Sequence, residues 1–222
     1  ICCDLDAFLD ADEAFRAGGV TGTLATELTF GLPAPNSIGA VEIALGDGRT
    51  VRVRGKADRV DRRADGTLVV IDYKTGSERS YKVLTHDEPV TAGTHLQLPV
   101  YAYAARAAFG VPDTKAEAYY WFVGRGKNLR IGYEVDESVD EVFATTLRGI
   151  VDGIEAGVFP AVPAEPAPTP FIACHFCDPD GMGTTDRWRE WQRKFGAPEL
   201  EGFRALSAAL VDPLTEAVAD AR

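Results

Sequence analysis

The chain has 222 residues, of which 45% are apolar and 26% are charged, and these proportions indicate one globular domain with a sizeable core. The formal net charge of −11 argues against a simple basic surface for nucleic acid. No apolar run approaches the ~20 residues that span a membrane, and the acidic residues that follow Ile1-Cys2-Cys3 argue against a secretory signal. Because there are 4 cysteines, we expect a reducing, cytoplasmic setting without a disulfide framework.

The N-terminal part is expected to form a helix and then two strands. Residues 4–16 have helical spacing, and Gly18-Gly19 is a typical helix end. Residues 23–30 and 41–45 favour strands. The apolar side chains expected near one face of the helix are Leu5, Phe8, Leu9 and Phe15.

A hairpin is predicted next, followed by a polar loop. Apolar and basic residues alternate over residues 51–56, as in a half-exposed strand, whereas residues 68–71 form an apolar run typical of a buried strand. Residues 64–66 suit a three-residue hairpin loop, with Gly66 at the position that needs a positive φ. Residues 77–93 are polar, and loops of this length often have a function.

The length of the hairpin loop fixes which residues face each other. If Arg63 pairs with Thr67, Asp58 lies opposite Asp72, and Lys74 shares their face of the sheet. Two carboxylates about 5 Å apart repel each other, so we interpret them as ligands of a cation, and oxygen ligands favour Mg²⁺ or Mn²⁺. A lysine beside the cation can stabilise charge that develops on a phosphate oxygen. The alternative is that both aspartates are solvent-exposed strand ends and the lysine forms an ordinary surface pair.

A helix is expected after the polar loop. Thr94 is a typical N-cap, and Gly110 is a typical residue to follow the helix end. Pro99 falls early in this helix, where it is expected to displace the helix start or distort the first turns. Gln97 and Tyr101 are one turn apart and share a face. The alternative is that the tyrosine packs in the core and the glutamine is exposed.

Two strands and a long helix complete the predicted core. Residues 118–123 and 128–135 favour paired strands, and we interpret the aromatic residues of the first as core rather than as a platform for stacked bases. Ser138 and Glu141 have the spacing of a capping box. The apolar residues expected on the core face of the following helix are Val142, Phe143, Leu147, Ile150, Val151 and Ile154.

The last part of the chain is expected to wrap around the core as part of the same domain. We divide the chain into a core of residues 1–160 and a C-terminal extension of residues 161–222. The extension is predicted to contain a proline-rich extended stretch and three helices, at residues 162–170, 186–194, 199–210 and 213–221. Two interpretations are open for the first of these helices: it lies along a nucleic-acid backbone with its arginines on phosphates, or its tryptophans pack it onto the core with the charges in solvent. We favour packing for the tryptophans.

Several motifs occur in a fixed order: an acidic strand residue at Glu27, GKADRVD at residues 55–61, VIDYKTG at residues 70–76, and a Gln-x-x-x-Tyr pair at Gln97 and Tyr101. This ordered set resembles the PD-(D/E)XK nuclease superfamily, and in particular its RecB/AddB-type exonuclease branch. The resemblance implies an α/β fold with a restriction-endonuclease-like core, in which helices flank a mixed central sheet, and a helical C-terminal extension.

The resemblance also implies metal-dependent hydrolysis of DNA. The implied catalytic residues are Asp58, Asp72, Lys74, Glu27, Gln97 and Tyr101, and the implied ligands of Mg²⁺ or Mn²⁺ are Asp58, Asp72, the carbonyl of Tyr73, and Glu27 directly or through water. In this arrangement the lysine positions the attacking water, and the glutamine and tyrosine hold the phosphate in line.

Many members of that branch hold a four-iron–four-sulfur cluster with one upstream cysteine and a C-x2-C-x5-C trio. Cys174 and Cys177 match the first two positions of the trio, but Gly183 stands at the third. Three interpretations are open: a cluster completed by an N-terminal cysteine, a zinc site that includes His175, and a reduced CxxC turn without metal.

DNA is the partner implied by the resemblance, together with the rest of a longer parent chain or a helicase subunit, because the chain begins at Ile1 without methionine. Basic residues cluster locally despite the acidic total, and we expect these clusters to favour DNA binding. The clusters are Arg52, Arg54, Lys56, Arg59, Arg62 and Arg63, and then Arg187, Arg189, Arg193 and Lys194. The competing functions are a non-catalytic scaffold or DNA-binding module of a helicase–nuclease complex, and a calcium-stabilised binding domain.

Overall fold

The computed structural model describes residues 2–124, 127–160 and 187–207. The chain divides into two compact units, residues 1–148 and 149–222. The boundary proposed at residue 160 between a core and an extension stays a prediction. In the described ranges, no helix combines the length and apolar character needed to cross a bilayer.

The first unit is built on a mixed sheet of five strands in the order β1-β4-β5-β6-β7. Neighbouring strands are antiparallel except β5 and β6, which are parallel. Two further strands, β2 and β3, pair as a separate antiparallel hairpin. The strands are β1 Val20–Phe30, β2 Val41–Ala44, β3 Thr50–Val53, β4 Gly55–Arg63, β5 Leu68–Lys74, β6 Ala116–Gly124 and β7 Lys127–Val135.

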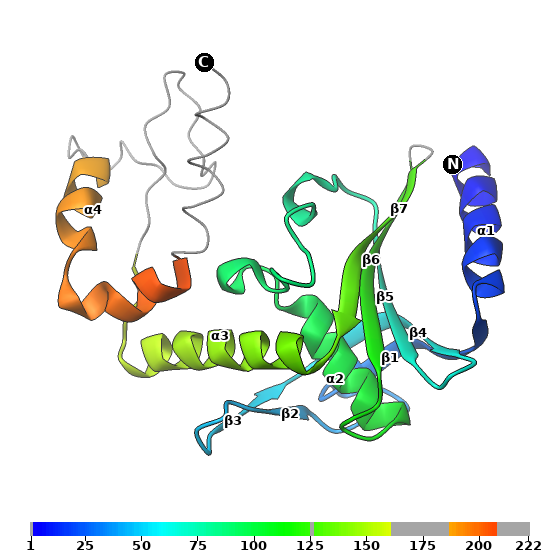
Figure 1. The fold of residues 1–222 in the computed structure, drawn as a ribbon, viewed down its shortest axis with the longest axis horizontal. Coiled ribbons are helices and arrows are strands. Elements are labelled where there is room, and N and C mark those ends of the chain that lie inside the picture. Colours follow the sequence, from blue (N-terminus) through cyan, green and yellow to red (C-terminus); the bar gives the residue numbers. More distant parts are fainter. Residues whose placement is uncertain (1, 125–126, 161–186, 208–222) are drawn as a thin grey trace. The chain divides into compact units, whose positions relative to one another are not determined.

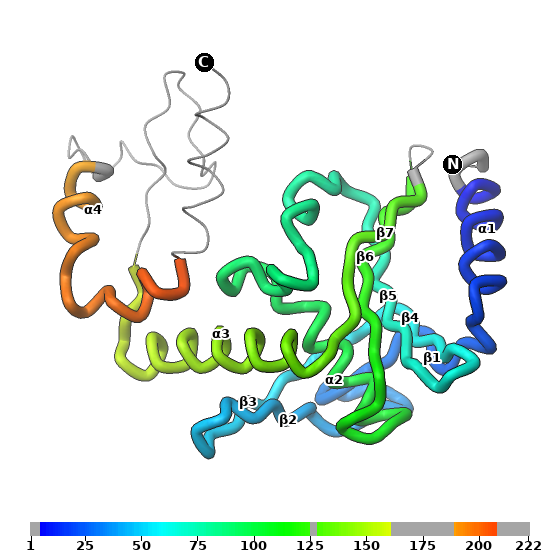
Figure 2. Tube along the Cα trace, in the orientation of Figure 1, coloured from blue at the N-terminus to red at the C-terminus, as the bar shows by residue number. Residues whose placement is uncertain are grey.

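The helices α1 and α2 cover opposite faces of the five-stranded sheet (Figure 1). A parallel strand pair needs a long crossover, and α2 lies in the connection from β5 to β6, as the chain trace shows (Figure 2). The helices are α1 Cys2–Ala17, α2 Gln97–Phe109, α3 Glu137–Glu155 and α4 Arg187–Phe195, and the 3₁₀ turns are η1 Arg79–Tyr81, η2 Thr91–Gly93 and η3 Pro198–Leu200.

An aromatic core lies between α1 and the sheet. Phe8 and Phe15 of α1 make edge-to-face contacts with Trp121 at ring-centroid distances of 5.5 and 5.3 Å, a favoured aromatic geometry. Because Trp121 is fully buried, the prediction that the aromatic residues of β6 are core is confirmed. Leu5 and Leu9 are 55% and 54% exposed, so their expected packing is wrong: they form a neighbouring stripe that turns away from the sheet.

The start of α2 differs from the prediction, and its end agrees with it. Thr94 does not cap the helix, because its hydroxyl donates to the Thr91 carbonyl of the preceding 3₁₀ turn at 2.8 Å. The helix begins at Gln97, so that Pro99 lies in the first turn, where its missing N–H removes no intrahelical hydrogen bond. Gly110 ends the helix, as predicted, and its N–H donates to the Arg106 carbonyl at 2.9 Å.

The N-cap of α3 is Asp136 rather than Ser138. Asp136 Oδ1 accepts hydrogen bonds from the Val139 N–H at 3.1 Å and from the Ser138 hydroxyl at 2.7 Å. The predicted capping box is therefore wrong by two residues, since the helix begins earlier and an aspartate caps its first turn. The side chains that α3 buries are Val139, Phe143, Thr146 and Leu147.

Two apolar residues of α3 that were expected in the core are exposed. Val142 is 42% exposed and Ile154 is 53% exposed, while Ile150 and Val151 are half-buried. The buried set follows a stripe of one helix face, and Val142 lies beside that stripe. Phe143 and Leu147, which are on the stripe, confirm the remaining part of the prediction.

The second unit contains α4 and a helical segment at residues 201–207. Trp191 of α4 contacts Phe195 and Phe203, at ring-centroid distances of 5.4 and 6.0 Å. Packing of this tryptophan is thus confirmed, but the contacts shown lie within the second unit, whereas the prediction had the helix pack onto the core. The elements predicted at residues 162–170 and 213–221 lie outside the described residues.

The correct cap of α3 can be tested by stability measurements. We expect Asp136→Ala to lower the free energy of unfolding by about 0.5–2 kcal/mol, the usual effect of removing an N-cap, because the Val139 N–H loses its acceptor. Ser138→Ala should change it by less, since the Ser138 hydroxyl only donates to the same carboxylate. Urea unfolding of both variants measures the difference, and equal effects would contradict the assignment.

Candidate active site

The predicted register of the central hairpin is confirmed. β4 and β5 pair from Arg59 with Ile71 to Arg62 with Leu68, and the Arg63 N–H donates to the Thr67 carbonyl at 2.9 Å. Asp58 and Asp72 are the next residues beyond the last of these pairs. Instead of a ladder hydrogen bond, the Asp58 side chain accepts the Tyr73 N–H through Oδ2 at 2.8 Å.

Asp72 is buried in a set of polar contacts. It is 5% exposed, and its Oδ1 accepts a hydrogen bond from Gln97 Nε2 at 3.2 Å. Its Oδ2 forms an ion pair with the Lys74 ammonium, but this buried oxygen accepts no hydrogen bond of ordinary geometry from the described residues. An ionised carboxylate has about four lone-pair positions, so Asp72, held by one amide and one ammonium among the described residues, keeps positions that a further cationic ligand can occupy.

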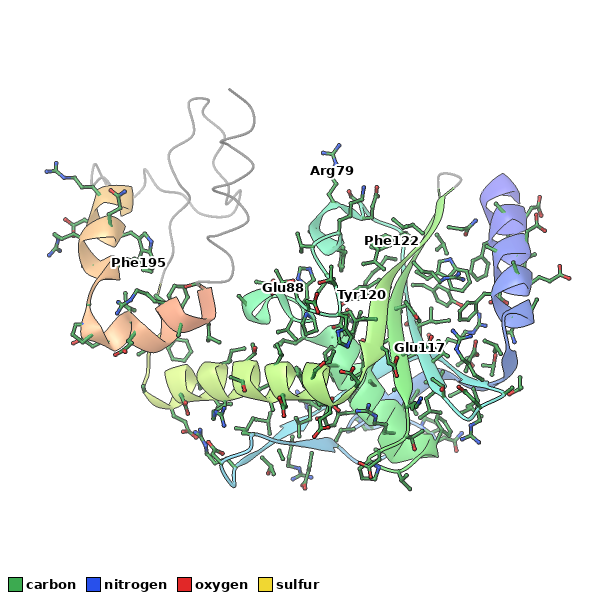
Figure 3. The ribbon with its side chains drawn as sticks, in the orientation of Figure 1. Arg79, Glu88, Glu117, Tyr120, Phe122 and Phe195 are labelled. Atoms are coloured by element: carbon green, nitrogen blue, oxygen red, sulfur yellow. The ribbon has the colours of Figure 1, made fainter. Side chains whose placement is uncertain are left out.

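Lys74 is directed toward the site rather than into solvent. Its ammonium donates to Gln97 Oε1 at 3.3 Å and lies 5.1 Å from the centroid of the Tyr120 ring. Tyr120 and Phe122 come from β6 and lie beside the segment between β5 and α2 (Figure 3). The interpretation of Asp72 and Lys74 as an ordinary solvent-exposed pair does not fit this environment.

Gln97 and Tyr101 present one face of the first turns of α2 to the two β5 residues. Gln97 Nε2 lies 2.6 Å from the Tyr101 hydroxyl, to which it donates. Tyr101 is 8% exposed, and its ring contacts Phe30 edge-to-face at 6.2 Å. The glutamine thus links the carboxylate, the ammonium and the phenol, so the alternative that it is an exposed residue is wrong.

The electrostatic environment makes ionisation of Asp72 less favourable than that of a free aspartate. Burial raises the pKa of Asp72 above its ordinary value, the Lys74 ammonium partly opposes this rise, and the charge of Asp58 adds to it. Burial likewise raises the pKa of Tyr101. Because two nearby acids disfavour each other's ionisation, a bound cation would relieve the cost of keeping both charged.

Glu27 lies across from Asp58 on β1, but its side chain has another partner. The flanking β1 residues Thr26 and Leu28 pair with Arg59 and Ala57. Glu27 itself has a φ of 59°, a conformation that is uncommon for a residue other than glycine and that is enriched at functional sites. Its carboxylate accepts a hydrogen bond from the Lys56 ammonium at 2.6 Å.

The carboxylates available at this site suit a cation that keeps many of its waters. Within residues 2–124, 127–160 and 187–207, no group of three or more His, Cys, Asp or Glu side chains is able to hold a metal ion, so Glu27 is not grouped with the two aspartates. Mg²⁺ is usually bound by one or two carboxylates together with water and substrate oxygens. Asp58 and Asp72, which lie close enough for the charge of Asp58 to raise the pKa of Asp72, fit that donor set.

A cavity lies directly beyond Lys74 at the ends of the parallel strands. Its volume is about 330 Å³, and its lining residues are Thr75, Gly76, Ser77, Glu78, Arg79, Phe122, Val123 and Gly124. Arg79 extends outward from this segment (Figure 3). Ligands of open α/β sheets commonly bind beyond the carboxyl ends of parallel strands, so the cavity provides room for part of a ligand next to Lys74.

Comparison with known proteins agrees with this geometry. A sequence profile of the PD-(D/E)XK nuclease superfamily matches residues 6–180. The chain belongs to the PD-(D/E)XK nuclease superfamily. The Gene 69 protein of Mycobacterium phage D29 is 32% identical over 159 residues, which are 71% of this chain and 46% of the phage protein. The chain thus spans about half the length of this relative.

Membership of the PD-(D/E)XK nuclease superfamily accounts for the architecture. The five-stranded mixed sheet with helices on its faces is a restriction-endonuclease-like fold, as predicted. This superfamily is one of nucleases, and its members typically use divalent metals. Cys174, Cys177, His175 and Gly183 lie outside the described residues, so the CxxC interpretations stay open.

The basic cluster predicted around the hairpin is not a free cationic surface. Arg59 is 5% exposed, Lys56 pairs with Glu27 at 2.6 Å, and Arg63 pairs with Glu117 at 2.7 Å. Arg52 lies 3.6 Å from Glu42, and Arg62 donates to the Phe109 carbonyl at 2.8 Å. The prediction treated positive charge along a strand as exposed, whereas acidic residues and a carbonyl on neighbouring elements engage most of it.

A second polar cluster, on the α1 face of the sheet, was missed by the sequence reasoning. Arg59 donates to both carboxylate oxygens of Asp61 at 2.8–2.9 Å, to Asp12 Oδ1 at 2.5 Å and to the Tyr73 hydroxyl at 3.0 Å. Asp61 is fully buried. The signal was present in GKADRVD, because strand alternation places its arginine and last aspartate together on the face opposite Asp58.

The environment of Asp72 predicts its titration in the metal-free protein. We expect a pKa above 3.8 for Asp72, and a higher value still in Lys74→Met, because the ammonium that stabilises the charged carboxylate is removed. Since the folded-state pKa is raised, the contribution of Asp72 to stability is present below its unfolded pKa and is lost as the pH rises through the folded value.

Carboxyl-carbon NMR titration measures this pKa directly. Lys82→Met is the matched control, because Lys82 is an exposed lysine near Glu78 and has no contact with Asp72. A pKa of Asp72 at or below 3.8, or no further rise in Lys74→Met, would contradict the environment described above.

Proposed function

We propose that this chain is a Mg²⁺- or Mn²⁺-dependent deoxyribonuclease of the RecB/AddB-like type, acting as an exonuclease. The observation that supports this most directly is the connected set of Asp72, Lys74, Gln97 and Tyr101, with Asp58 on the adjacent strand. These residue types in this geometry provide metal ligands, a cation and phosphate-orienting groups at one place on the sheet.

Asp58, Asp72 and the Tyr73 carbonyl would hold the divalent ion, with Glu27 completing the site through water. When bound, such an ion lowers the pKa of water and offsets charge that develops during phosphodiester hydrolysis. The left-handed backbone at Glu27 supports a functional role, because strained conformations persist where the surrounding structure holds them. Its present partner, Lys56, is 44% exposed, and exposed ion pairs are weak enough to exchange partners.

Lys74 would place the attacking water and stabilise negative charge on the phosphate. Gln97 already donates to Asp72 Oδ1 and to the Tyr101 hydroxyl, so it holds the carboxylate and the phenol in a fixed relation. Preorganised donors need little rearrangement in the transition state. Both groups on α2 are thus suited to keep the scissile phosphate in line, and the cavity beyond Lys74 would accept the adjoining nucleotides.

The acidic character of the chain is accommodated if other parts of a longer protein supply DNA affinity. The chain spans 46% of the phage relative, and its formal net charge is −11. We therefore propose that it is the nuclease domain of a larger protein of recombination or repair, with the remaining parent chain or a helicase subunit as partner.

One observation favours a second candidate, a non-catalytic nuclease-like scaffold. Most of the basic side chains near the site are engaged by acidic neighbours, as at Lys56, Arg59 and Arg63, which leaves little free positive charge for DNA. A scaffold, however, does not require the buried Asp72–Lys74 pair linked to Gln97.

Cleavage assays on linear single- and double-stranded DNA separate these candidates. With Mn²⁺, the wild type should release nucleotides, and Asp72→Ala should lose cleavage because the cation loses a ligand. Lys74→Ala should keep its fold and metal binding but cleave about 10²–10³-fold more slowly, the usual effect of removing one group that stabilises transition-state charge.

Asp113→Ala and Lys115→Ala are the matched controls, because both residues are exposed and precede β6, whose opposite end lines the cavity. Circular dichroism and thermal unfolding confirm that each variant is folded. Full activity of Lys74→Ala would rule out its assigned role, and an inactive wild type that still binds DNA would favour the scaffold.

A further inference from the structure

The cluster on the α1 face joins three elements directly behind the proposed metal site. We call it the Arg59 brace, and it consists of Arg59, Asp61, Asp12 and Tyr73. Arg59 contacts Asp12 on α1, Asp61 on its own strand and Tyr73 on β5. Arg59 is 5% exposed and Asp61 is fully buried, so these polar contacts are formed inside the sheet–helix interface.

The brace lies at the point where the hairpin ladder ends. β4 pairs with β5 only as far as Arg59 and Ile71, whereas it continues to pair with β1 as far as Gly55. Beyond Ile71, β5 is still paired with β6. On the β4 side, the described contacts that hold the segment from Asp72 to Lys74 come from side chains rather than from the ladder.

Two of these side-chain contacts act on the same residue from opposite faces. The Tyr73 N–H is bound by Asp58 at 2.8 Å, and the Tyr73 hydroxyl accepts a hydrogen bond from Arg59 at 3.0 Å. Tyr73 stands between Asp72 and Lys74 in the chain, and Arg59 follows Asp58. A shift of Arg59 or of Tyr73 would therefore change the distance between the carboxylates of Asp58 and Asp72.

Stability alone is a weak reason for such a cluster. Buried ion pairs lose much of their attraction to desolvation, and apolar residues of similar volume often give equal or greater stability. Arg59 directly follows Asp58 in the chain, and Tyr73 directly follows Asp72. This position suggests that the cluster orients the two carboxylates.

We propose that Arg59 and Tyr73 are positioning residues that set the spacing of Asp58 and Asp72 for a divalent cation. This rests on the proposed nuclease function. Removing Arg59 would leave Asp61 buried without its partner, which is strongly destabilising, so Tyr73→Phe is the informative variant: it keeps the ring and removes the hydroxyl that Arg59 binds.

Tyr119→Phe is a closely matched control. Tyr119 packs against the same aromatic core, and its hydroxyl donates to Glu117 at 2.9 Å, a carboxylate that is paired with Arg63. The Tyr119→Phe variant therefore also loses one hydroxyl that is bound to an ion pair on this sheet. Unlike Tyr73, however, residue 119 is not next to Asp72 or Lys74 in the sequence. Thermal unfolding of both variants compares their general effect on the fold.

We expect Tyr73→Phe to weaken Mn²⁺ binding and to lower kcat by about 10-fold to 100-fold, the usual effect of removing a group that orients metal ligands, with KM for DNA unchanged. Tyr119→Phe should keep both values within about 2-fold of the wild type, since its hydroxyl orients no residue of the site. Unchanged Mn²⁺ affinity and kcat in Tyr73→Phe, or equal losses in both variants, would overturn the proposal.

A readout that does not depend on cleavage separates this proposal from the proposed function. Hydrogen exchange of the Tyr73 amide, whose acceptor is Asp58, should be at least about 10-fold faster in Tyr73→Phe than in Tyr119→Phe, because local opening sets exchange. If the wild type cleaves no DNA, the nuclease function fails while the exchange result still tests the positioning. Equal exchange in the two variants would overturn the brace as a positioning device.

Discussion

The antiparallel pairing of β4 with β5 is the constraint on which the site depends. Successive side chains of β4 point to opposite faces of the sheet: Asp58 faces α2, and Arg59 faces α1. One stretch of backbone therefore supplies the acids on one face and their support on the other. A slip of one residue would exchange the two sets, placing a guanidinium where an acid stands and burying the wrong charges.

Electrostatics explains why this arrangement needs both faces. On the α2 face, burial raises the pKa of Asp72, against the opposing effect of Lys74, so the acid is held at an energetic disadvantage. On the α1 face, burial would raise the pKa of Asp12, but hydrogen bonds from Arg16 and Arg59 bring it below its ordinary value. The pKa of the acid is thus lowered on one face and raised on the other. The face with the raised pKa is the one that carries the proposed metal site.

Local periodicity and loop length predicted most strands and the hairpin register, whereas the mixed sheet and the meeting of Gln97 and Tyr101 with Asp72 were expected from the family resemblance. The sequence-based predictions were wrong where contacts with a neighbouring element determine which residue caps a helix or is buried. Asp136 replaces Ser138 as the cap of α3, and Leu9 turns away from the sheet. The left-handed backbone of Glu27 has no signal in single-residue propensities. Likewise, the charge of Arg59 suggested solvent exposure, although its spacing from Asp61 already indicated a shared face.

The single parallel pair in the sheet has a consequence for how the domain assembles. β4 and β5 are joined by the short turn of residues 64–67, whereas β5 meets β6 after the chain has passed through α2. Closing a short loop is entropically easier than closing a long one, and non-local strand pairing is slow. The two acids are therefore expected to meet in a local step of folding, and Gln97 and Tyr101 to join them once a longer loop has closed. In that interval, the repulsion between the two carboxylates is offset by Lys74 of the same strand rather than by α2.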